Sequence, residues 1–491
     1  MEQKFDYYKI LGIRRNATPE EIRHAYLAAA RRLHPDANTT PGETEFFLHV
    51  QEAYEILADS EKRSKYDELL PLEKTSGTPV AQRILFSRKA LMRLNEPQLI
   101  YALLEYSPER ATGGTTSPPL NIALILDRST SMQGRHMDVV KATAIQILRR
   151  LRPQDTFSVI AFSDKAEVVI PATANIDPSK LEARIQMLNS GGGTEIFNGL
   201  EAGYNEVRLT SNRSHIDHLI LLTDGKTYGD EERCITLADQ AAKQGIGISG
   251  FGIGHEWNDT FLDELASRTG GSSQYISEPQ EIQRSLIEKF NQLGQVFSEE
   301  TRLTFTPSAG VELRYAFRIQ PDCGMLPNHS PMMLGPILRQ SNLKVLLEFS
   351  VNAEATRSET AVLFDGEGVF NIPAESSPQV NLKLRLLRPV TTKTVPDLPP
   401  QEIVESLSRL VLYRLQDQAR QEVAAGQYDQ AVKKLQRLAT HLLEIGERGL
   451  ARTALLEAEH IQREKSFSQV GNKQIKYGTR ALLLAGEEKK L

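Results

Sequence analysis

The 491-residue sequence lacks the marks of a secreted, membrane or nucleic-acid-binding protein. Its two cysteines, Cys234 and Cys323, lie far apart and do not have the spacing of metal ligands. No apolar run approaches the length needed to cross a bilayer, and the N-terminus lacks the apolar core of a signal peptide. The 58 basic and 63 acidic residues are mixed along the chain, so no nucleic-acid-binding surface is indicated. We therefore expect a cytoplasmic protein with no membrane span and no nucleic-acid partner.

The chain is longer than one hydrophobic core normally supports, so several domains are expected. Shifts in composition and in hydrophobic periodicity divide it into helical, strand-rich and mixed regions. The predicted parts are an all-α domain at 1–70, a polar linker at 71–80, strands at 81–118, an α/β domain at 119–296, a β-sandwich at 297–393, a Pro-rich hinge at 394–400 and a helical tail at 401–491.

Two amphipathic runs near the N-terminus flank the tripeptide His34-Pro35-Asp36. Apolar residues recur at helical spacing over residues 19–33, and a second amphipathic run covers residues 43–58. Two antiparallel helices joined by a tight turn would place His34 and Asp36 at the tip as exposed polar groups. Pro35 fixes φ in that turn and biases His34 toward an extended conformation. Taken alone, the tripeptide is more often a simple turn with a proline.

Five sequence landmarks occur in a fixed order in this region. They are D-Y-Y-K-I-L-G-I at 6–13, A-Y at 25–26, R-L-H-P-D at 32–36, E-A-Y-E-I-L at 52–57 and K-R-S-K-Y-D at 62–67. The ordered set resembles the J domain of DnaJ-type co-chaperones. The resemblance implies that the H-P-D loop and a basic face on the preceding helix dock on a DnaK-type chaperone and trigger its ATP hydrolysis. The residues to which this role is carried over are His34, Pro35 and Asp36 for the loop, and Arg23, Arg31 and Arg32 for the basic face.

This sequence departs from the family pattern in two respects. Leu27 and Ala28 stand where the family usually has basic residues, so we expect a smaller basic docking surface. The Gly/Phe-rich region and the C-x-x-C zinc module of longer J proteins are also absent from the sequence. Client recognition is therefore expected to come from the other domains.

From residue 120 the sequence alternates apolar strands with amphipathic helices. Strands such as N-I-A-L-I-L and H-L-I-L-L-T are apolar on both faces, which indicates a mostly parallel sheet covered by helices. Beyond residue 295 the strands alternate polar and apolar residues and suit an antiparallel sandwich. The predicted fold is thus multidomain: an all-α N-terminal domain, a doubly wound, Rossmann-like α/β domain inserted in or flanked by a β-sandwich, and a C-terminal helical domain. We expect the strands at 81–106 to complete the sandwich.

Polar residues follow two of the apolar strands at the points where they end. Asp127, Ser129 and Ser131 come at the end of N-I-A-L-I-L, and Asp224 follows H-L-I-L-L-T. Between them, G-G-G-T ends at Thr194, and the glycines allow its loop to approach closely. Side chains at the carboxyl ends of parallel strands converge on one crevice. Two carboxylates and three hydroxyls, without imidazole or thiolate, favour Mg²⁺, with Mn²⁺ as the alternative.

The D-x-S-x-S pattern with its later Thr and Asp resembles the metal-ion-dependent adhesion site of von Willebrand factor A (VWA) domains, and the resemblance covers roughly residues 121–294. It implies that Ser129, Ser131 and Thr194 contact the metal and that Asp127 and Asp224 act through water. A Glu or Asp of a partner protein would complete the coordination shell of the metal.

In a competing interpretation the same residues are structural. Asp127 and Ser129 would then form a turn and cap for the helix at Met137, and Thr194 would cap the helix at Ile196.

Other motifs do not indicate catalysis. No base is identifiable for Ser129 or Ser131, the chain has no complete P-loop, and His255-Glu256 has no second histidine at helical spacing. His215 and His218 lack a third metal ligand and are interpreted as surface residues. We therefore predict that the protein is not an enzyme and has no catalytic residues.

The preferred interpretation joins two recognition modules. The metal site would bind an acidic residue of a client or scaffold protein, and the J domain would deliver a DnaK-type chaperone to it. Tethering by the linker at 71–80 would raise the effective concentration of chaperone at the client. The alternative is an assembly factor in which the A domain works with an AAA-type ATPase and the J domain is an accessory.

Overall fold

The computed structural model describes most of the chain in two compact units. One unit is built on residues 1–73 together with 387–389, and the other on residues 74–386 and 390–491. The described residues are 7–11, 13, 17–33, 50–59, 62–63, 66, 78–109, 117–212, 214–227, 229–373, 379–393 and 399–484.

The N-terminal unit is helical, as predicted. Its described helical segments include α1 (Tyr7–Leu11), α2 (Pro19–Leu33) and residues 50–57. Thr18 and Glu21 begin α2 with reciprocal bonds, because the Thr18 amide donates to Glu21 Oε2 at 2.7 Å and the Glu21 amide donates to Thr18 Oγ1 at 3.2 Å. Tyr26 stacks on Tyr54 with ring centroids 4.1 Å apart, which joins α2 to the segment at 50–57.

The α/β domain is built on a six-stranded sheet of order β6-β5-β4-β7-β8-β9. Every neighbouring pair is parallel except β5 and β6, which are antiparallel. The whole of β4, β5 and β7 is buried, which confirms the expectation drawn from their apolar sequences. The strands are β4 (Leu120–Asp127), β5 (Thr156–Phe162), β6 (Ala166–Ala174), β7 (Ile216–Thr223), β8 (Gly247–Ile253) and β9 (Ser273–Ile276).

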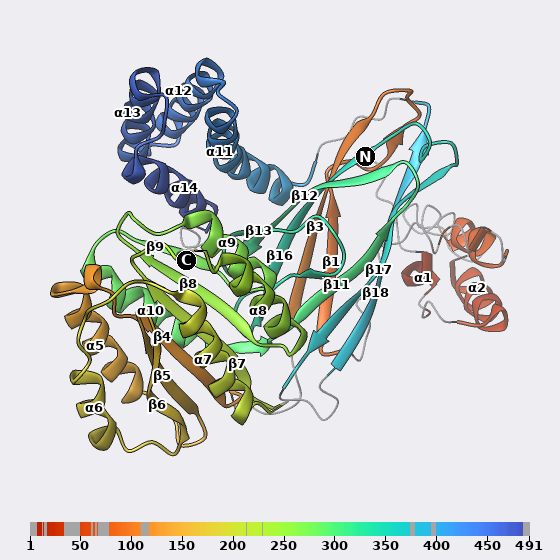
Figure 1. Cartoon of the computed structure of the whole chain (residues 1–491). Helices are drawn as coiled ribbons and strands as arrows, with labels where there is room; N and C mark the ends of the chain where they lie inside the picture. The colour runs from red at the N-terminus through yellow and green to blue at the C-terminus, as the bar shows by residue number, and fades with distance from the viewer. Residues whose placement is uncertain are drawn as a thin grey trace. The chain divides into compact units, whose positions relative to one another are not determined.

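Helices cover both faces of this sheet (Figure 1). Alternate residues of β4 enter two separate cores, with Leu124 in one and Ile125 in the other. The first core includes α5 (Arg135–Leu148), α6 (Pro178–Gln186) and α10 (Pro279–Leu293). The second includes α7 (Ile196–Thr210), α8 (Glu231–Lys243) and α9 (Asp259–Arg268). The order of elements is that of a doubly wound fold.

Helix α7 lies unusually close to the sheet because two of its residues are glycines. A Cβ on Gly199 would lie 2.6 Å from the Phe162 ring, and a Cβ on Gly203 would lie 2.6 Å from Ile125. The N-terminus of α7 follows Thr194 directly, so this close packing also places the Thr194 loop at the edge of the sheet.

The strands before and after the α/β domain form one β-sandwich. Its two sheets have the orders β1-β3-β16-β12-β13 and β14-β11-β17-β18-β2, and both sheets contribute to a single core. Strand β3 pairs antiparallel with β16, although the whole α/β domain lies between them in sequence. The predicted insertion is therefore confirmed. The strands of this region are β1 (Val80–Phe86), β2 (Leu91–Met92), β3 (Gln98–Pro108), β10 (Val296–Ser298), β11 (Thr301–Pro307), β12 (Val311–Gln320), β13 (Gly324–Leu326), β14 (Met332–Met333), β15 (Ile337–Leu338), β16 (Leu343–Val351), β17 (Thr360–Asn371) and β18 (Gln379–Thr391).

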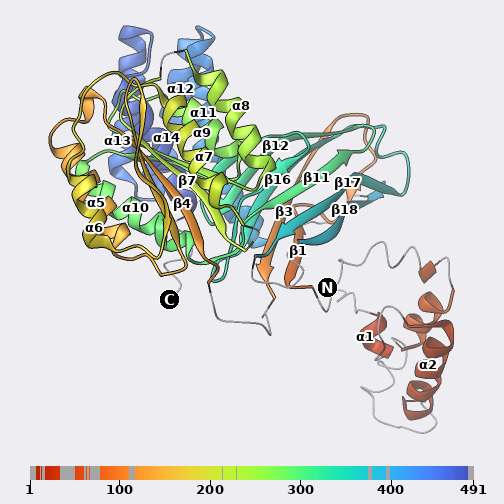
Figure 2. The same ribbon diagram turned by 60° about the horizontal axis from the view of Figure 1, so that its bottom comes forward.

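The C-terminal region is helical, as predicted, and packs on both the sandwich and the α/β domain (Figure 2). Phe317 and Leu346 of the sandwich share a hydrophobic cluster with Leu410 and Tyr413 of α11. Among the described helices, none is both long and apolar enough to cross a bilayer. The tail helices are α11 (Gln401–Ala424), α12 (Tyr428–Glu444), α13 (Arg448–Glu464) and α14 (Gln469–Leu484).

Five charged residues, which we call the docking cluster, join the tail to α9: Asp259, Asp263, Arg420, Lys476 and Arg480. Asp259 Oδ2 lies 2.5 Å from Lys476 Nζ and 2.8 Å from Arg420 Nη1. Asp263 Oδ2 lies 2.7 Å from both Lys476 Nζ and Arg480 Nη2. Because buried charges are tolerated only when they are paired, this arrangement holds the tail in one position.

Candidate metal centre

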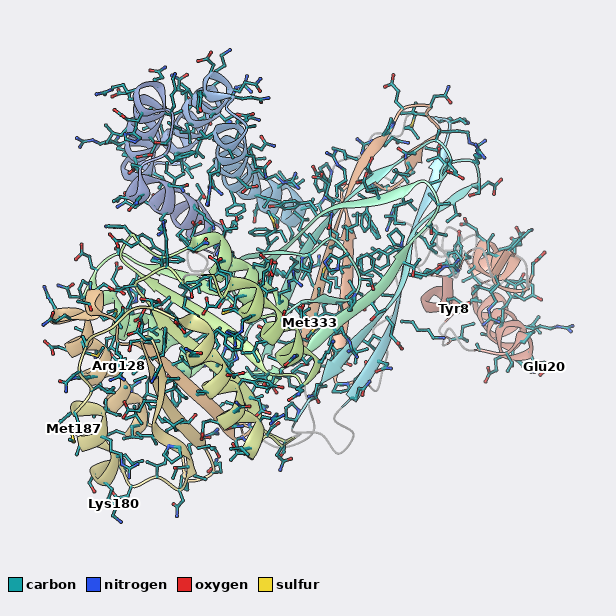
Figure 3. The ribbon with its side chains drawn as sticks, viewed as in Figure 1. Tyr8, Glu20, Arg128, Lys180, Met187 and Met333 are labelled. Atoms are coloured by element: carbon teal, nitrogen blue, oxygen red, sulfur yellow. The ribbon has the colours of Figure 1, made fainter. Side chains whose placement is uncertain are left out.

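Two strand ends bring four of the five predicted metal-site residues together at the carboxyl edge of the sheet. Arg128, labelled in Figure 3, directly follows Asp127 and marks this edge. Ser131 Oγ donates to Asp224 Oδ1 at 2.7 Å, and Ser129 Oγ lies 3.1 Å from Ser131 Oγ and 3.4 Å from Asp224 Oδ1. Asp127 joins this group through Ser129, whose backbone amide donates to Asp127 Oδ1 at 2.8 Å.

The Asp127 carboxylate is fully buried and is held by two hydrogen bonds. Its second oxygen accepts from Thr223 Oγ1 at 2.7 Å. Burial raises the pKa of Asp127 to about 6, although the bonds from Ser129 and Thr223 favour the charged form. A cation nearby would also favour the charged carboxylate. Thr223 was not assigned from the sequence; the available signal was its place directly before Asp224 in T-D-G.

The fifth residue, Thr194, lies beside the loop that carries Asp224. A Cβ placed on Gly225 would be only 3.0 Å from Thr194 Oγ1. The Thr194 residue is 9% exposed, and its hydroxyl makes no hydrogen bond to any part of the chain that the structure describes. Thr194 Oγ1 itself is not fully buried, so it remains accessible to a group that binds from outside the chain.

The Thr194 loop is held in place by Asp164 and by two of the three glycines. Asp164 Oδ1 accepts from the Gly193 amide at 2.9 Å, and a Cβ on either Gly192 or Gly193 would lie 2.6 Å from the Asp164 carboxylate. Gly192 also has a φ of +92°, which favours glycine. Its carbonyl accepts from both the amide and the hydroxyl of Thr130. Gly192 and Gly193 therefore allow the loop to lie close to Asp164.

The loop after β7 also fixes the start of α7. Thr227 Oγ1 accepts from the Ile196 amide at 3.2 Å, and Asp230 Oδ2 accepts from the Phe197 amide at 2.8 Å. The side chains that bond to the first amides of α7 therefore come from another loop and do not include Thr194. The sequence analysis did not identify Thr227 or Asp230, because their bonds cross more than thirty residues of chain.

The capping interpretation of the metal-site residues is wrong. The residue before α7 is Glu195, the residue before α5 is Gly134, and neither helix has a side-chain capping bond from that position. Ser129 precedes the short helix η1 (Thr130–Met132), and its side chain makes no capping bond there. The turn in that interpretation does exist, because Asp127 accepts from the Ser129 amide.

The donor set consists of oxygen atoms from two carboxylates and three hydroxyls. Over the described ranges, no group of three or more His, Cys, Asp or Glu side chains could hold a metal, so a metal here must use the hydroxyls. Oxygen ligands of this kind suit a small hard cation such as Mg²⁺. Burial raises the pKa of Asp224, whereas the Ser131 bond lowers it. The residues therefore fit a divalent cation in chemistry and in arrangement.

The predicted chaperone-docking residues are only partly described. Arg23 is exposed on α2, and Leu27, one turn later on the same face, is 41% exposed. Arg31 and Arg32 belong to α2, but their side chains lie outside the described residues. The H-P-D residues His34, Pro35 and Asp36 also lie outside them, and their predicted role remains a prediction.

One interpretation from the sequence is corrected by the burial of β7. His218 is 6% exposed, and its Nε2 lies 2.9 Å from Ser249 Oγ. Burial and then the positive charge of Lys289 lower the pKa of His218 well below its usual range. It is therefore a neutral buried residue, because helices cover both faces of its strand, and only His215 is partly exposed.

Family models match three parts of this chain. A DnaJ domain matches residues 6–67, a von Willebrand factor type A domain matches residues 121–292, and an Sll0103-like, C-terminal alpha-helical domain matches residues 401–485. The chain is a J-domain protein with a VWA domain. The DnaJ match agrees with the helical N-terminal unit, and the VWA match agrees with the inserted α/β domain. The third match coincides with the helical tail.

Curated relatives resemble separate parts of this J-domain protein. Uncharacterized protein sll0103 of Synechocystis sp. is 34% identical over 179 residues, which cover 36% of this chain and 42% of that protein. Chaperone protein DnaJ of Carboxydothermus hydrogenoformans is 56% identical over 66 residues, which cover 13% of this chain and 17% of that protein. The chain thus spans less than half the length of the curated relatives it matches.

Two solved structures share the fold over most of the chain. A von Willebrand factor type A protein from Catenulispora acidiphila has a TM-score of 0.64 at 16% identity and covers 84% of this chain and 98% of its own. The ArnB paralog VWA2 from Sulfolobus acidocaldarius has a TM-score of 0.53 at 15% identity. The match covers 83% of this chain and 99% of that chain. The shared fold therefore extends well beyond the VWA domain itself.

Proposed function

We propose that this J-domain protein stimulates the ATPase of a DnaK-type chaperone and binds a protein partner through a Mg²⁺-dependent site on its VWA domain. The main support is the oxygen cluster at the carboxyl edge of the sheet, where Asp127, Ser129, Ser131 and Asp224 meet beside the unpaired hydroxyl of Thr194. Mn²⁺ is the alternative ion, and the proposed compartment is the cytoplasm.

In this proposal the hydroxyls of Ser129, Ser131 and Thr194 hold the ion, and Asp127 and Asp224 act through water. The bound ion, coordinated mostly by neutral oxygens, supplies positive charge that attracts a carboxylate from an acidic residue of a client or scaffold protein. The chain's own contribution is to keep these oxygens in place. Thr223 and the Ser129 amide orient Asp127, and no residue is assigned a catalytic role.

The proposed role of the N-terminal unit rests on its DnaJ match and on the exposed face of α2. Arg23 would contact the chaperone on this face, with Arg31 and Arg32 continuing it, and His34, Pro35 and Asp36 would form the loop that triggers hydrolysis. The exposed Leu27 replaces a basic residue in the middle of that face. We therefore expect the protein to prefer a DnaK-type partner that does not need a strongly basic docking surface.

Separate variants of the two modules test the proposal. Asp36→Asn should abolish stimulation of chaperone ATPase and leave partner capture intact, whereas Ser131→Ala should do the reverse. Ser179→Ala, an exposed serine on α6 of the same domain, is the matched control and should change neither. Capture of the partner is measured by pull-down with and without EDTA. If neither EDTA nor Ser131→Ala changes capture, the proposed metal-dependent binding of the partner is ruled out. Co-purification of an AAA-type ATPase without a DnaK-type chaperone would favour the alternative function, an assembly factor that works with such an ATPase.

A further inference from the structure

A cleft of about 570 Å³ lies where the VWA domain, the sandwich and the helical tail meet. Its walls come from α9, from the hairpin around β13, and from α11 and α14, which lie near one another in Figures 1 and 2. This volume is in the range of small-molecule sites, which often form at domain interfaces. The cleft is separate from the metal centre, because it shares no lining residue with it.

The lining of the cleft is rich in charged side chains. Five lining residues are basic and three are acidic, but Asp259 and Asp322 pair with basic lining residues from just outside the lining and offset the difference. The basic residues are Arg268, Arg318, Arg420, Lys476 and Arg480, and the acidic residues are Asp263, Glu264 and Asp417. The charges therefore nearly balance, and the kind of ligand depends on which hydrogen-bond donors remain free.

Most of these cations already have partners. Arg318 donates to backbone carbonyls, including those of Gly270 and Leu334, and also pairs with Asp322. Lys476 is shared between the two carboxylates of the docking cluster. Arg268 pairs with carboxylates at the surface. These residues shape the cleft but have little hydrogen-bonding capacity left for a ligand.

Arg420 is different, because only part of its guanidinium group is used. Its Nη1 donates to Asp259 Oδ2 at 2.8 Å, and the side chain is 19% exposed. Among the described residues, no hydrogen bond involves its Nε or Nη2. These two nitrogens lie on one edge of the planar group and can together bind two oxygens of a single carboxylate or phosphate.

A second unsatisfied donor occurs in the same wall. Arg480 is 6% exposed, and its Nη1 and Nη2 pair with Asp263, but its Nε has no hydrogen-bond partner within the described part of the chain. A buried N–H without a partner is uncommon in a folded protein. In the described part of the chain, two arginines of the cleft thus keep donors without a partner, but Arg480 Nε is buried, and Arg420 has the more exposed side chain.

The wall formed by the hairpin supplies apolar surface. Met325, which is exposed, lines the cleft together with Leu326 and Pro327, and His329 lies close by in sequence. A site that combines a few oriented donors with apolar surface suits a ligand with an anionic group on an organic body.

We propose that this cleft binds a small organic anion, with its carboxylate or phosphate held by Nε and Nη2 of Arg420 and its body against Met325. Because the walls belong to three domains, a bound anion stabilises the docked position of the tail. The proposal does not depend on the metal centre.

Ala424 offers a variant that blocks the anion without removing a buried charge. It is exposed, lines the cleft and lies one turn after Arg420 on α11. Ala424→Glu would place a carboxylate within reach of Arg420 and compete with the ligand. Ala424→Gln has nearly the same size without the charge and is the matched control. Both variants should melt within a few degrees of the unmodified protein, because the substituted side chain is at the surface.

Isothermal titration tests the proposal with citrate and phenylphosphate as probes. It uses the full chain, which is first freed of divalent ions on a chelating resin. At least one probe should bind the unmodified protein, and Ala424→Glu should raise its Kd by about tenfold or more while Ala424→Gln changes it little. A glutamate pentapeptide is titrated in parallel. The proposal is overturned if neither small anion binds, if the two variants behave alike, or if only the pentapeptide binds, which would assign the cleft to an acidic protein segment.

Discussion

The candidate metal centre and the docking cluster each contain two aspartates, three of them buried and Asp263 half-buried, but the surroundings of these aspartates are opposite. Around Asp127 and Asp224 the neighbours are hydroxyls, and burial raises the pKa of both carboxyl groups. For Asp259 and Asp263 burial also acts to raise the pKa, but the charges of Lys476, Arg420 and Arg480 outweigh it and lower the pKa of both. One pair of carboxylates already has Lys and Arg partners, whereas no Lys or Arg in the described part of the chain forms an ion pair with the other pair. This contrast explains why one site is structural and why we propose the other as a binding site.

The largest expected effect comes from removing a carboxylate that has its cations. Asp263→Asn would leave Lys476 and Arg480 without one of their buried partners, and we expect the free energy of unfolding to fall by about 3–5 kcal/mol. Unfolding is followed by the fluorescence of Trp257, which is buried and is the only tryptophan in the sequence. Asp239→Asn is the control, because Asp239 pairs with Arg268 at the surface and should contribute less than about 1 kcal/mol. Equal effects of the two variants would contradict the structural role of the docking cluster.

A smaller effect is expected from adding Mg²⁺, if it binds at the candidate metal centre as proposed. Mg²⁺ at about 100 times its Kd should raise the free energy of unfolding by about 2.7 kcal/mol, because the ion binds only the folded state. Thermal melts with Mg²⁺ and with EDTA measure this difference. Ser131→Ala should remove most of the Mg²⁺-dependent increase, whereas Asp263→Asn should lower stability and retain the increase. A Ser131→Ala protein that Mg²⁺ stabilises as much as the original would contradict the assignment of this residue.

The stabilisation that the docking cluster provides should persist at mildly acidic pH. Because the folded-state pKa values of Asp259 and Asp263 are lowered, their contribution to stability is fully present above the unfolded value of about 3.9 and is lost as the pH falls below it. We therefore expect the tail to stay docked down to about pH 4. Trp257 can report this, because Lys473 of α14 donates to the Trp257 carbonyl and lies 4.5 Å from its ring centroid. Lys476→Met, which removes one cation, should move the fluorescence transition to higher pH, and no movement would be the contradictory result.

The smallest effect is expected at the surface of the N-terminal unit, where an added charge remains in water. Leu27→Lys restores a basic residue to the exposed face of α2 and should strengthen binding to a DnaK-type chaperone by about twofold to fivefold. The gain should disappear at high salt. Titration of chaperone ATPase measures it, and Leu209→Lys, at an exposed leucine of the VWA domain, is the control. A large gain that is insensitive to salt would mean that Leu27 contacts the chaperone through something other than charge.

Local sequence patterns were sufficient to predict that the oxygen-bearing residues of the candidate metal site meet; that they bind a metal stays a prediction. Asp127 and Asp224 each end an apolar strand, and the geometry of a parallel sheet brings such strand ends together, so their meeting followed from short stretches of sequence. The insertion of the α/β domain was predicted for a similar reason, since strands of one alternating type flank a region of another type. The helical tail followed from hydrophobic periodicity.

The docking cluster could not be predicted in this way. Asp259 and Lys476 are separated by 217 residues, and each is an ordinary charged residue on an amphipathic helix. Their pairing depends on how α14 packs against α9, which no periodic pattern specifies. The same limit explains the error at His218, because its burial is decided by helices that lie elsewhere in the chain.

The insertion of the VWA domain between β3 and β11 has a mechanical consequence. The domain is attached by two covalent connections, one leading into β4 and one leading out of α10, and the docking cluster adds a third, non-covalent attachment. The domain therefore cannot simply rotate about a single joint. If a partner binds at the metal site as proposed, a force on that site would be divided between the sandwich and the tail.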